Sequence, residues 1–366
     1  MFLENYFIIL IESNTVNLEE ISIVYLNASF IYKPKLIISH STFYQNFGNI
    51  GGALFISQYE TFIENSFFLE NFGFDLGGAI CLSSNIITII NTLFIRNVAE
   101  YGGAIYVDIQ VFPSIDEARN LTITSSYFHN NLAMGSGGAI YLIKNVFDFT
   151  ILIESSYFFK NAALIGGVFC LNQFSGNTTV FKSHFVSNFA EYGGGIYLQS
   201  NASCLFMNNI FIANAAIKIF IKIVGIYDEF FANYTMNVVI AQCLLSNLTD
   251  DFLISDPIFS FPNLYDMVLN QQLPNEDYVA ISAIIGGVFI CDSYVYGTST
   301  NSKQNLFKRN LALERGGVVS LIHGNFTDEE SQFIENSGAF GGVFDAEDGS
   351  NIIIEGSNFS RNSANT

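Results

Sequence analysis

The sequence holds few side chains whose type and spacing suit catalysis. Enzymes that cleave acidic polysaccharides need clustered carboxylates with Arg or Lys, and often Ca²⁺. The candidate groups are the adjacent Asp250 and Asp251 and the short acidic group of Asp345, Glu347 and Asp348. Neither group forms a legible catalytic cluster, and solvated loop acids are the simpler interpretation. We therefore expect no catalytic residue in this chain.

Histidine and cysteine, the usual zinc ligands, are scattered along the chain. The histidines lack the paired spacing of a zinc site. They are His40, His129, His184 and His323. The cysteines are odd in number, so they do not indicate a disulfide framework. They are Cys81, Cys170, Cys204, Cys243 and Cys291. We expect no cofactor and no metal, with Ca²⁺ as the ion that so acidic a chain would suit.

The charge balance excludes one class of partner. Only 14 residues are Lys or Arg and the formal net charge is −19, whereas nucleic-acid binding needs clustered cations. The longest apolar stretch, residues 215–227, is interrupted by Lys218 and Lys222 and falls short of a membrane span of roughly 18 residues. We expect no nucleic acid, and any membrane attachment would come through sequence outside this chain.

Two short signatures alternate along the sequence and organise it. The first is F-x-x-N, with Phe at positions 43, 68, 94, 128, 158, 185, 211, 307, 333 and 359, and a degenerate copy at Leu244/Asn247. The second is a glycine pair that follows eight or nine residues after the Phe. It begins at Gly51, Gly77, Gly102, Gly137, Gly166, Gly193, Gly286, Gly316 and Gly341. Such a register cannot plausibly arise by chance, so the chain is an array of one repeat.

The hydrophobic pattern of the repeat indicates strands. After each glycine pair the second and fourth residues are apolar, as at Ile105 and Val107, and a β-branched run precedes each Phe. The F-x-x-N segment makes a short third strand. Repeats of this length without a helical period stack as a solenoid. The sequence predicts an all-β fold, a right-handed parallel β-helix with three short strands per coil of about 25–27 residues and about 11 coils.

Stacking explains why the same residue types recur at the same point of each coil. Equivalent residues lie about 4.8 Å apart, so Asn over Asn can bond amide to amide and Phe rings fill the interior. Glycine permits the positive φ of a tight turn, and Asn tolerates a left-handed backbone. We interpret both signatures as structural. The predicted ladder comprises Asn46, Asn71, Asn97, Asn131, Asn161, Asn188, Asn214, Asn310 and Asn336.

The alternation of F-x-x-N with G-G-A-[ILV] resembles the repeat of the polymorphic outer-membrane proteins. Two copies carry the resemblance most closely, FIRNVAEYGGAIY at 94–106 and FVSNFAEYGGGIY at 185–197. The resemblance covers residues 43–366 and implies a pectin-lyase-like β-helix of a surface adhesin. Residues 1–42 are expected to form degenerate coils that continue from upstream sequence, which would make the chain a fragment of a longer protein.

Two features outside the repeat core are candidates for binding. The third residue after the glycine pair should point outward and form an exposed aromatic stripe, for which we single out Tyr106, Tyr141 and Tyr197. Cover by long loops is an equally good interpretation of that position. The second feature is an acidic insertion at 248–283, whose candidate binding residues are Asp250, Asp251, Asp256 and Tyr265. Such a loop is either functional or simply solvated.

The sequence thus predicts a non-enzymatic repeat segment of a large cell-surface or secreted protein. Its role would be adhesion and recognition of a protein or carbohydrate ligand, or that of a structural shaft. The alternative is a pectin-lyase-like enzyme, a lyase or glycoside hydrolase acting on polysaccharide. Eight N-x-[ST] sequons give weak support to an extracellular location. They are Asn27, Asn120, Asn177, Asn201, Asn233, Asn247, Asn325 and Asn358.

Overall fold

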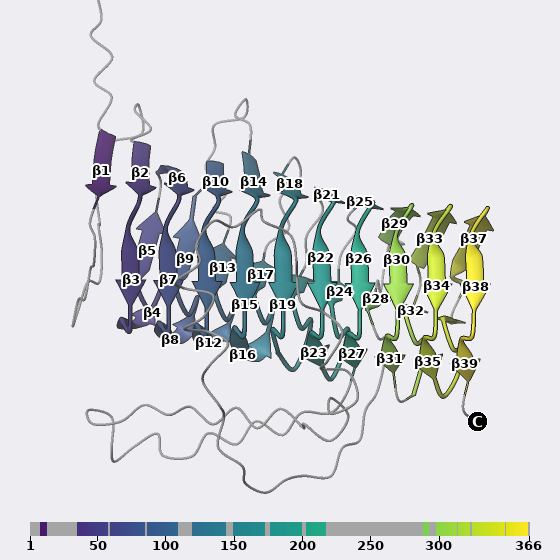
Figure 1. The fold of residues 1–366 in the computed structure, drawn as a ribbon. Coiled ribbons are helices and arrows are strands. Elements are labelled where there is room, and N and C mark those ends of the chain that lie inside the picture. The colour runs from purple at the N-terminus through teal and green to yellow at the C-terminus, as the bar shows by residue number, and fades with distance from the viewer. Residues whose placement is uncertain are drawn as a thin grey trace, which may run out of the picture. The chain divides into compact units, whose positions relative to one another are not determined.

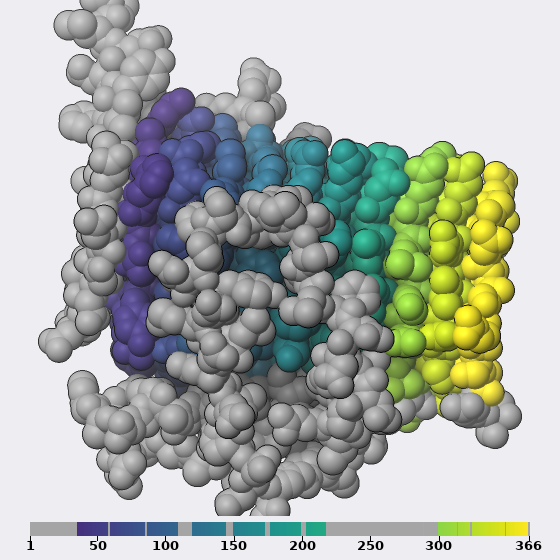
Figure 2. Space-filling view, in the orientation of Figure 1, coloured from purple at the N-terminus to yellow at the C-terminus, as the bar shows by residue number. Residues whose placement is uncertain are grey.

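The computed structural model is an all-β parallel solenoid. It describes residues 8–12, 35–57, 59–84, 86–108, 119–143, 149–172, 176–199, 203–216, 288–292, 298–312, 314–322, 324–347 and 349–364. Every paired strand runs parallel to its neighbours, and each coil lies directly on the one before it (Figure 1). The coils appear as side-by-side bands in the space-filling view (Figure 2). The repeat of F-x-x-N and a glycine pair therefore forms the stacked, parallel coils that the sequence predicts.

The strands form four sheets, which we name A to D in the order in which a coil visits them. Sheet A contains β1 (Ile8–Glu12), β2 (Lys35–Ser39), β6 (Glu60–Glu64), β10 (Ile86–Ile90), β14 (Arg119–Thr124), β18 (Phe149–Glu154), β21 (Asn177–Phe181), β25 (Ser203–Met207), β29 (Thr298–Lys303), β33 (Gly324–Glu329) and β37 (Asn351–Glu355). Sheet B contains β3 (Thr42–Tyr44), β7 (Phe67–Leu69), β11 (Leu93–Ile95), β15 (Tyr127–His129), β19 (Tyr157–Phe159), β22 (His184–Val186), β26 (Ile210–Ile212), β30 (Leu306–Lys308), β34 (Gln332–Ile334) and β38 (Asn358–Ser360).

Sheets C and D complete each coil. Sheet C is split into β4 (Phe47–Ile50), β8 (Phe72–Leu76), β12 (Val98–Tyr101) and β16 (Leu132–Ser136), then β23 (Phe189–Ala190), β27 (Ala215–Ala216), β31 (Leu311–Ala312), β35 (Ser337–Gly338) and β39 (Ser363–Ala364). Sheet D contains β5 (Leu54–Ser57), β9 (Ile80–Ser83), β13 (Ile105–Asp108), β17 (Ile140–Ile143), β20 (Phe169–Asn172), β24 (Ile196–Gln199), β28 (Phe289–Asp292), β32 (Val319–Ile322) and β36 (Phe344–Glu347).

Two details differ from the sequence prediction. A coil has four strands rather than three, because the residues between the Asn and the glycine pair add the short strands of sheet C. Those segments are brief and partly bulged, so they carry no period-two signal. Within the described ranges, the nine strands of sheet D correspond to about nine full turns, fewer than the predicted number of about 11.

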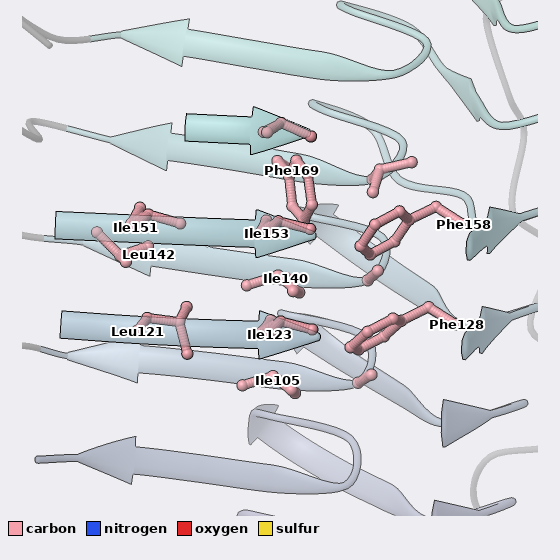
Figure 3. Close-up of a cluster of buried hydrophobic side chains, with 14 of the residues drawn as sticks. Ile105, Leu121, Ile123, Phe128, Ile140, Leu142, Ile151, Ile153, Phe158 and Phe169 are labelled. Atoms are coloured by element: carbon pink, nitrogen blue, oxygen red, sulfur yellow. The ribbon is translucent and has the colours of Figure 1, made fainter. Parts of the chain in front are cut away.

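Inward-facing columns fill the interior of the solenoid. The Phe of each F-x-x-N signature from Phe43 to Phe333 is buried and stacks on its copy, with centroid distances of 4.7 Å for Phe43–Phe68 and 5.0 Å for Phe68–Phe94. Aliphatic residues from sheets A and D pack against this column, as Ile123 and Ile140 do beside Phe128 (Figure 3). Stacked rings and aliphatic columns exclude water along the axis, which is the main source of stability in such a fold.

The Asn side chains form a continuous hydrogen-bonded ladder between sheets B and C. Each Asn Nδ2 donates to the Oδ1 of the next Asn, at 2.8 to 3.2 Å, from Asn46 through to Asn362. The same Oδ1 accepts the backbone N–H of the Asn below, and from Asn71 onward the second amide hydrogen goes to the carbonyl of a Phe one coil back, as Asn97 does to Phe68. All four bonding positions of a mid-ladder amide are therefore used.

The left-handed backbone lies one residue before the ladder, not on it. The residue preceding each Asn has φ between 53° and 56°, as at Glu70, Arg96 and Lys160. The expectation that Asn itself adopts this conformation is therefore wrong. The reason is geometric, because the reversal one residue earlier leaves the Asn side chain aligned with the axis and able to reach its copy.

A second ladder, which the sequence analysis missed, runs between sheets A and B. Its members stand two residues before each Phe, and most accept the backbone N–H of the equivalent residue one coil earlier, as Ser156 does from Ser126 at 3.2 Å. Most also donate their hydroxyl to the carbonyl two residues before them, as Ser126 does at 2.9 Å. They are Ser41, Ser66, Thr92, Ser126, Ser156, Ser183, Asn209, Asn305, Ser331 and Ser357.

The Asn ladder also locates the insertion. Asn214 donates directly to Asn310 at 3.2 Å, and β26 pairs with β30, although 96 residues separate the two rungs. No rung therefore stands between them, and the degenerate copy Leu244/Asn247 lies outside the described residues. Strand β27 of sheet C ends at Ala216 and the next described strand, β28 of sheet D, begins at Phe289, so the insertion predicted at 248–283 lies outside the described residues.

The glycine pairs let one coil approach the next. Gly102 has φ +67°, which L side chains rarely adopt. A Cβ on its neighbour Gly103 would lie 2.2 Å from the carbonyl oxygen of Gly138 in the following coil. The first glycine therefore makes the turn and the second allows close contact between coils.

Replacing Asn97 by Leu should destabilise the solenoid. The change removes the acceptor of the Asn71 amide and backbone N–H and the donor to Phe68 O, leaving buried polar groups unpaired. Since one such group costs about 1–3 kcal/mol, we expect a loss of about 3 kcal/mol in the free energy of unfolding, measured by urea denaturation. Asn177→Leu, on the exposed outer side of sheet A, is the control and should change it by less than about 0.5 kcal/mol. Equal effects of the two variants would contradict the ladder.

Replacing Gly103 by Ala should also destabilise the fold, through contact between coils rather than through φ. We expect a loss of about 3 kcal/mol, because the added methyl meets rigid backbone on the neighbouring coil. Gly349→Ala is the matched control, since Gly349 has φ +77° but nothing within 4 Å of the added Cβ. Left-handed strain alone should cost it about 1–2 kcal/mol. The thermal unfolding midpoints of the two variants give the comparison, and a milder effect at Gly103 would refute the close-contact role.

Candidate functional site

The outer face of sheet D does not expose the predicted aromatic stripe. Tyr106 and Tyr141 point outward as expected, yet they are only 8% and 5% exposed, so the expectation of an open stripe is wrong for both. They form a second apolar cluster with Cys81 and Cys170. Residues just before the glycine pairs pack on it, as Tyr101 does with its ring 5.4 Å from that of Tyr141. Tyr197 is partly buried beside the same cluster.

The cysteines of this cluster are unsuited to nucleophilic chemistry. Cys81 and Cys170 are buried and form no disulfide, and the same holds for Cys204 in the interior of the solenoid. Burial raises the pKa of the Cys170 thiol to about 12 and also raises that of Cys81, so both stay protonated at neutral pH. Their shared position in the repeat therefore reflects packing on the outer side of sheet D.

Several sequence candidates fall outside what the structure describes. They are Asp250, Asp251, Asp256, Tyr265, Asp348 and His323. Within the described residues, no group of three or more His, Cys, Asp or Glu could hold a metal ion. No helix in that part of the chain is long and apolar enough to cross a membrane.

Two of the predicted loop acids lie on the outer face of sheet D near its end. The guanidinium of Arg315 pairs with Glu347 and lies 3.8 Å from the Oδ2 of Asp345. Burial raises the pKa of Asp345, the Arg315 charge lowers it, and Glu347 raises it, with burial the largest effect. Two carboxylates beside an arginine are thus brought together, a grouping that the sequence did not reveal because 29 positions separate Arg315 from its nearest member.

A third carboxylate is sealed inside the solenoid. Asp328 occupies an inward position of β33 at 0% exposure, where earlier coils carry Ile89, Ile123 or Ile153. The hydroxyls of Ser331 and Ser357 donate to it at 2.6 and 2.5 Å. A substrate cannot reach this group, so its role is confined to the packing of the last coils.

The outer face of sheet B carries aromatic and aliphatic side chains that the sequence analysis did not single out. They are the residues on either side of each Phe in F-x-x-N, which point away from the interior. In the coils before the insertion they are Thr42, Tyr44, Phe67, Leu69, Leu93, Ile95, Tyr127, His129, Tyr157, Phe159, His184, Val186, Ile210 and Ile212. In the last three coils the same columns hold Leu306, Lys308, Gln332, Ile334, Asn358 and Ser360. Stacking therefore tolerates polar residues there.

Rings gather where β15, β19 and β22 lie side by side. Tyr127, Tyr157 and His184 share one column, with centroids 6.3 and 4.5 Å apart. In the parallel column the ring of His129 lies 5.1 Å from that of Phe159. We call these five residues the aromatic face. The signal that could have found it is the residue type flanking each buried Phe.

His129 is held neutral within this face. It is 6% exposed, and its Nδ1 has no hydrogen-bond partner among the described residues. Burial lowers its pKa to about 3, with smaller contributions from the charges of Lys160 and Arg96. Folding therefore excludes the protonated form over most of the acidic range.

This depressed pKa predicts how stability varies with pH. Below the ordinary pKa of about 6.5, His129 binds a proton in the unfolded chain but stays neutral in the folded one. The free energy of unfolding is therefore highest above that pH and decreases as the pH falls toward 3. His129→Phe, the residue type next in the column, removes this term. We expect the variant to gain about 2 kcal/mol over the natural chain between pH 7 and pH 4.5, in urea denaturation. A stability difference independent of pH would show that His129 is not buried neutral.

Comparison with known proteins gives three matches, each covering part of the chain. Residues 125–142 match the repeat of the Chlamydia polymorphic membrane proteins. The chain is 28% identical over 196 residues to metabotropic glutamate receptor-like protein R of Dictyostelium discoideum, which covers 52% of the chain and 11% of that protein. It is 32% identical over 175 residues to the probable autotransporter YfaL of Escherichia coli, covering 41% of the chain and 14% of that protein.

The chain spans a small fraction of either relative, and no solved structure matches it significantly. The match at residues 125–142 covers β15, the Asn131 rung, the Gly137 turn and the start of β17, so it contains both signatures of the repeat. These signatures recur in the other coils with the same ladder and the same turn. The chain is accordingly a parallel β-solenoid, and its repeat at residues 125–142 is similar to that of the polymorphic membrane proteins.

Proposed function

We propose that this chain is a non-enzymatic segment of a cell-surface or secreted protein and that its solenoid presents outer faces for adhesion or recognition. The observation that carries the proposal is the uneven distribution of outward residues. Ladders and core columns run through all the coils, whereas rings and apolar side chains on the outer sides of sheets B and D are concentrated before the insertion. The fold does not require them there, so a function other than stacking accounts for them.

An exposed location is consistent with other features of the surface. The names of the matched proteins denote a membrane protein repeat, an autotransporter and a receptor-like protein. Sequon residues Asn120, Asn177 and Asn325 lie in one outward column of sheet A, where the last two are exposed. A protein or carbohydrate on a cell surface is the partner that such a molecule would meet.

A polysaccharide-cleaving enzyme is the second candidate, and Arg315 with Asp345 and Glu347 is the grouping that favours it. Its geometry argues for a structural role, because Glu347 already pairs with the guanidinium. Similar ion pairs join neighbouring coils nearby, as between Lys303 and Glu329 at 2.6 Å and between Arg309 and Glu335 at 2.8 Å. We therefore assign this trio to coil-to-coil pairing.

The proposal predicts saturable binding without turnover. The labelled chain should bind intact animal, plant or bacterial cells in flow cytometry, and the heat-unfolded chain should not. Incubation with pectin, alginate or chitin should release no reducing ends and no unsaturated sugars. Release of product that stops in the Asp345→Asn variant would establish the enzymatic alternative. Failure to bind any of these cells would leave a structural shaft as the better account.

A further inference from the structure

We infer that the aromatic face of sheet B, together with Lys160 and Lys182, is a binding site for an anionic glycan. The inference rests on the proposed recognition function and names its site and ligand class. The five rings of this face come from three neighbouring coils, so they form one continuous strip across the solenoid. Strips of rings at this spacing suit the flat apolar faces of successive sugar residues.

The fold does not demand rings at these positions. The same two columns hold Lys308, Gln332 and Ser360 in the last coils, where the Phe stack and the Asn ladder continue unchanged. Packing between coils therefore leaves the outward residues free to vary. Aromatic residues at five of the six outward positions in β15, β19 and β22 thus point to a ligand.

The charges around the strip indicate an anion. Lys160 follows β19 on the border with sheet C, and Lys182 precedes β22 on the border with sheet A, so the two lysines flank sheet B on opposite sides. Each ammonium lies over a ring, 5.0 Å from the centroid of Phe159 and 4.7 Å from that of Phe181. Neither forms an ion pair within the described part of the chain.

Most described cations elsewhere pair across coils, Lys35 with Glu60, Lys303 with Glu329 and Arg309 with Glu335. Lys308 also forms no ion pair within the described residues, but unlike Lys160 and Lys182 it lies over no ring there. In a chain with 33 acidic residues and 14 basic ones, two lysines beside rings but without a carboxylate are placed to meet a charge from outside. Burial also lowers the pKa of Lys160, a cost that a bound carboxylate or sulfate would offset.

A buried polar group inside the strip supports the same site. His129 lies between Tyr127 and Phe159, and its Nδ1 has no partner within the described residues. A buried ring nitrogen without a hydrogen bond is costly unless a ligand supplies one. A sugar hydroxyl can donate to or accept from a neutral imidazole, whereas an apolar partner can do neither.

The test is calorimetric titration of the full chain with matched probes. A galacturonate oligomer and heparin are the anionic probes, and a galactose oligomer of the same length is the neutral one. We expect at least one anionic probe to bind, more weakly as salt rises, and the galactose oligomer to bind at least tenfold more weakly. Binding of carboxylated but not sulfated sugar, or the reverse, would identify the anionic group. Equal binding of the neutral oligomer, or no binding of either anionic probe, would overturn the inference.

Variants locate the site. Lys160→Gln with Lys182→Gln, and separately Tyr157→Ala, should each raise the Kd for the anionic probe at least tenfold. The controls are Lys303→Gln, which removes a lysine paired with Glu329, and Phe340→Ala, which removes a ring that is 60% exposed on another part of the surface. Both controls should leave the Kd within twofold. Thermal unfolding midpoints near that of the natural chain exclude misfolding as the cause. Unchanged affinity in the folded double variant would place the ligand elsewhere.

Failure of this inference differs from failure of the proposed function. If the chain binds cells and these variants bind equally well, recognition stands and the aromatic face is not its site. If enzymatic removal of acidic glycans from those cells abolishes binding by the natural chain, and the double lysine variant no longer binds untreated cells, both hold together.

Discussion

Parallel stacking of one coil on the next is the constraint on which the rest of this molecule depends. A coil displaced along the axis would leave both its backbone groups and its buried amides unpaired, which is costly away from water. The Asn ladder makes this constraint specific, because each amide uses two donors and two acceptors on its neighbours. The register of every sheet then follows from the register of the ladder.

This constraint determines which features of the structure could be predicted from the sequence. Columns that must repeat, such as Phe68 over Phe94, leave a signature, so the coil, its core and the Asn ladder were predictable. The ladder of Ser126 and its equivalents was missed because Ser, Thr and Asn all supply the required acceptor there. Sheet C was missed because its first four strands shift register at an irregularity and its later strands span only two residues, so none shows a regular alternation. The burial of Tyr141 could not be predicted, since it depends on packing by Tyr101 from a different coil.

The candidate site was less predictable than the fold for the same reason. Outward columns are free of the stacking constraint, so they show no period and no single residue type. Tyr157 and Lys160 flank the Phe and the Asn of one F-x-x-N signature. In a later coil the equivalent positions hold Leu306 and Arg309, and the signature itself is unchanged. What distinguishes them is their neighbours in other coils, and those neighbours become known only when the register is known. Functional residues in a solenoid are therefore recognised by comparing coils within one structure.

The insertion shows that turns, like the outward columns, can vary without disturbing the stacked core. Asn214 and Asn310 bond as adjacent rungs although they are 96 positions apart in the sequence, so the excursion leaves the ladder intact. The cost of closing a loop rises only slowly with its length, by about 0.6 kcal/mol for each doubling. A turn can thus take up a long segment at small cost, whereas a single unpaired amide in the ladder costs more. Variation in such a repeat is accordingly confined to turns and outward columns, which are also the parts that meet a partner.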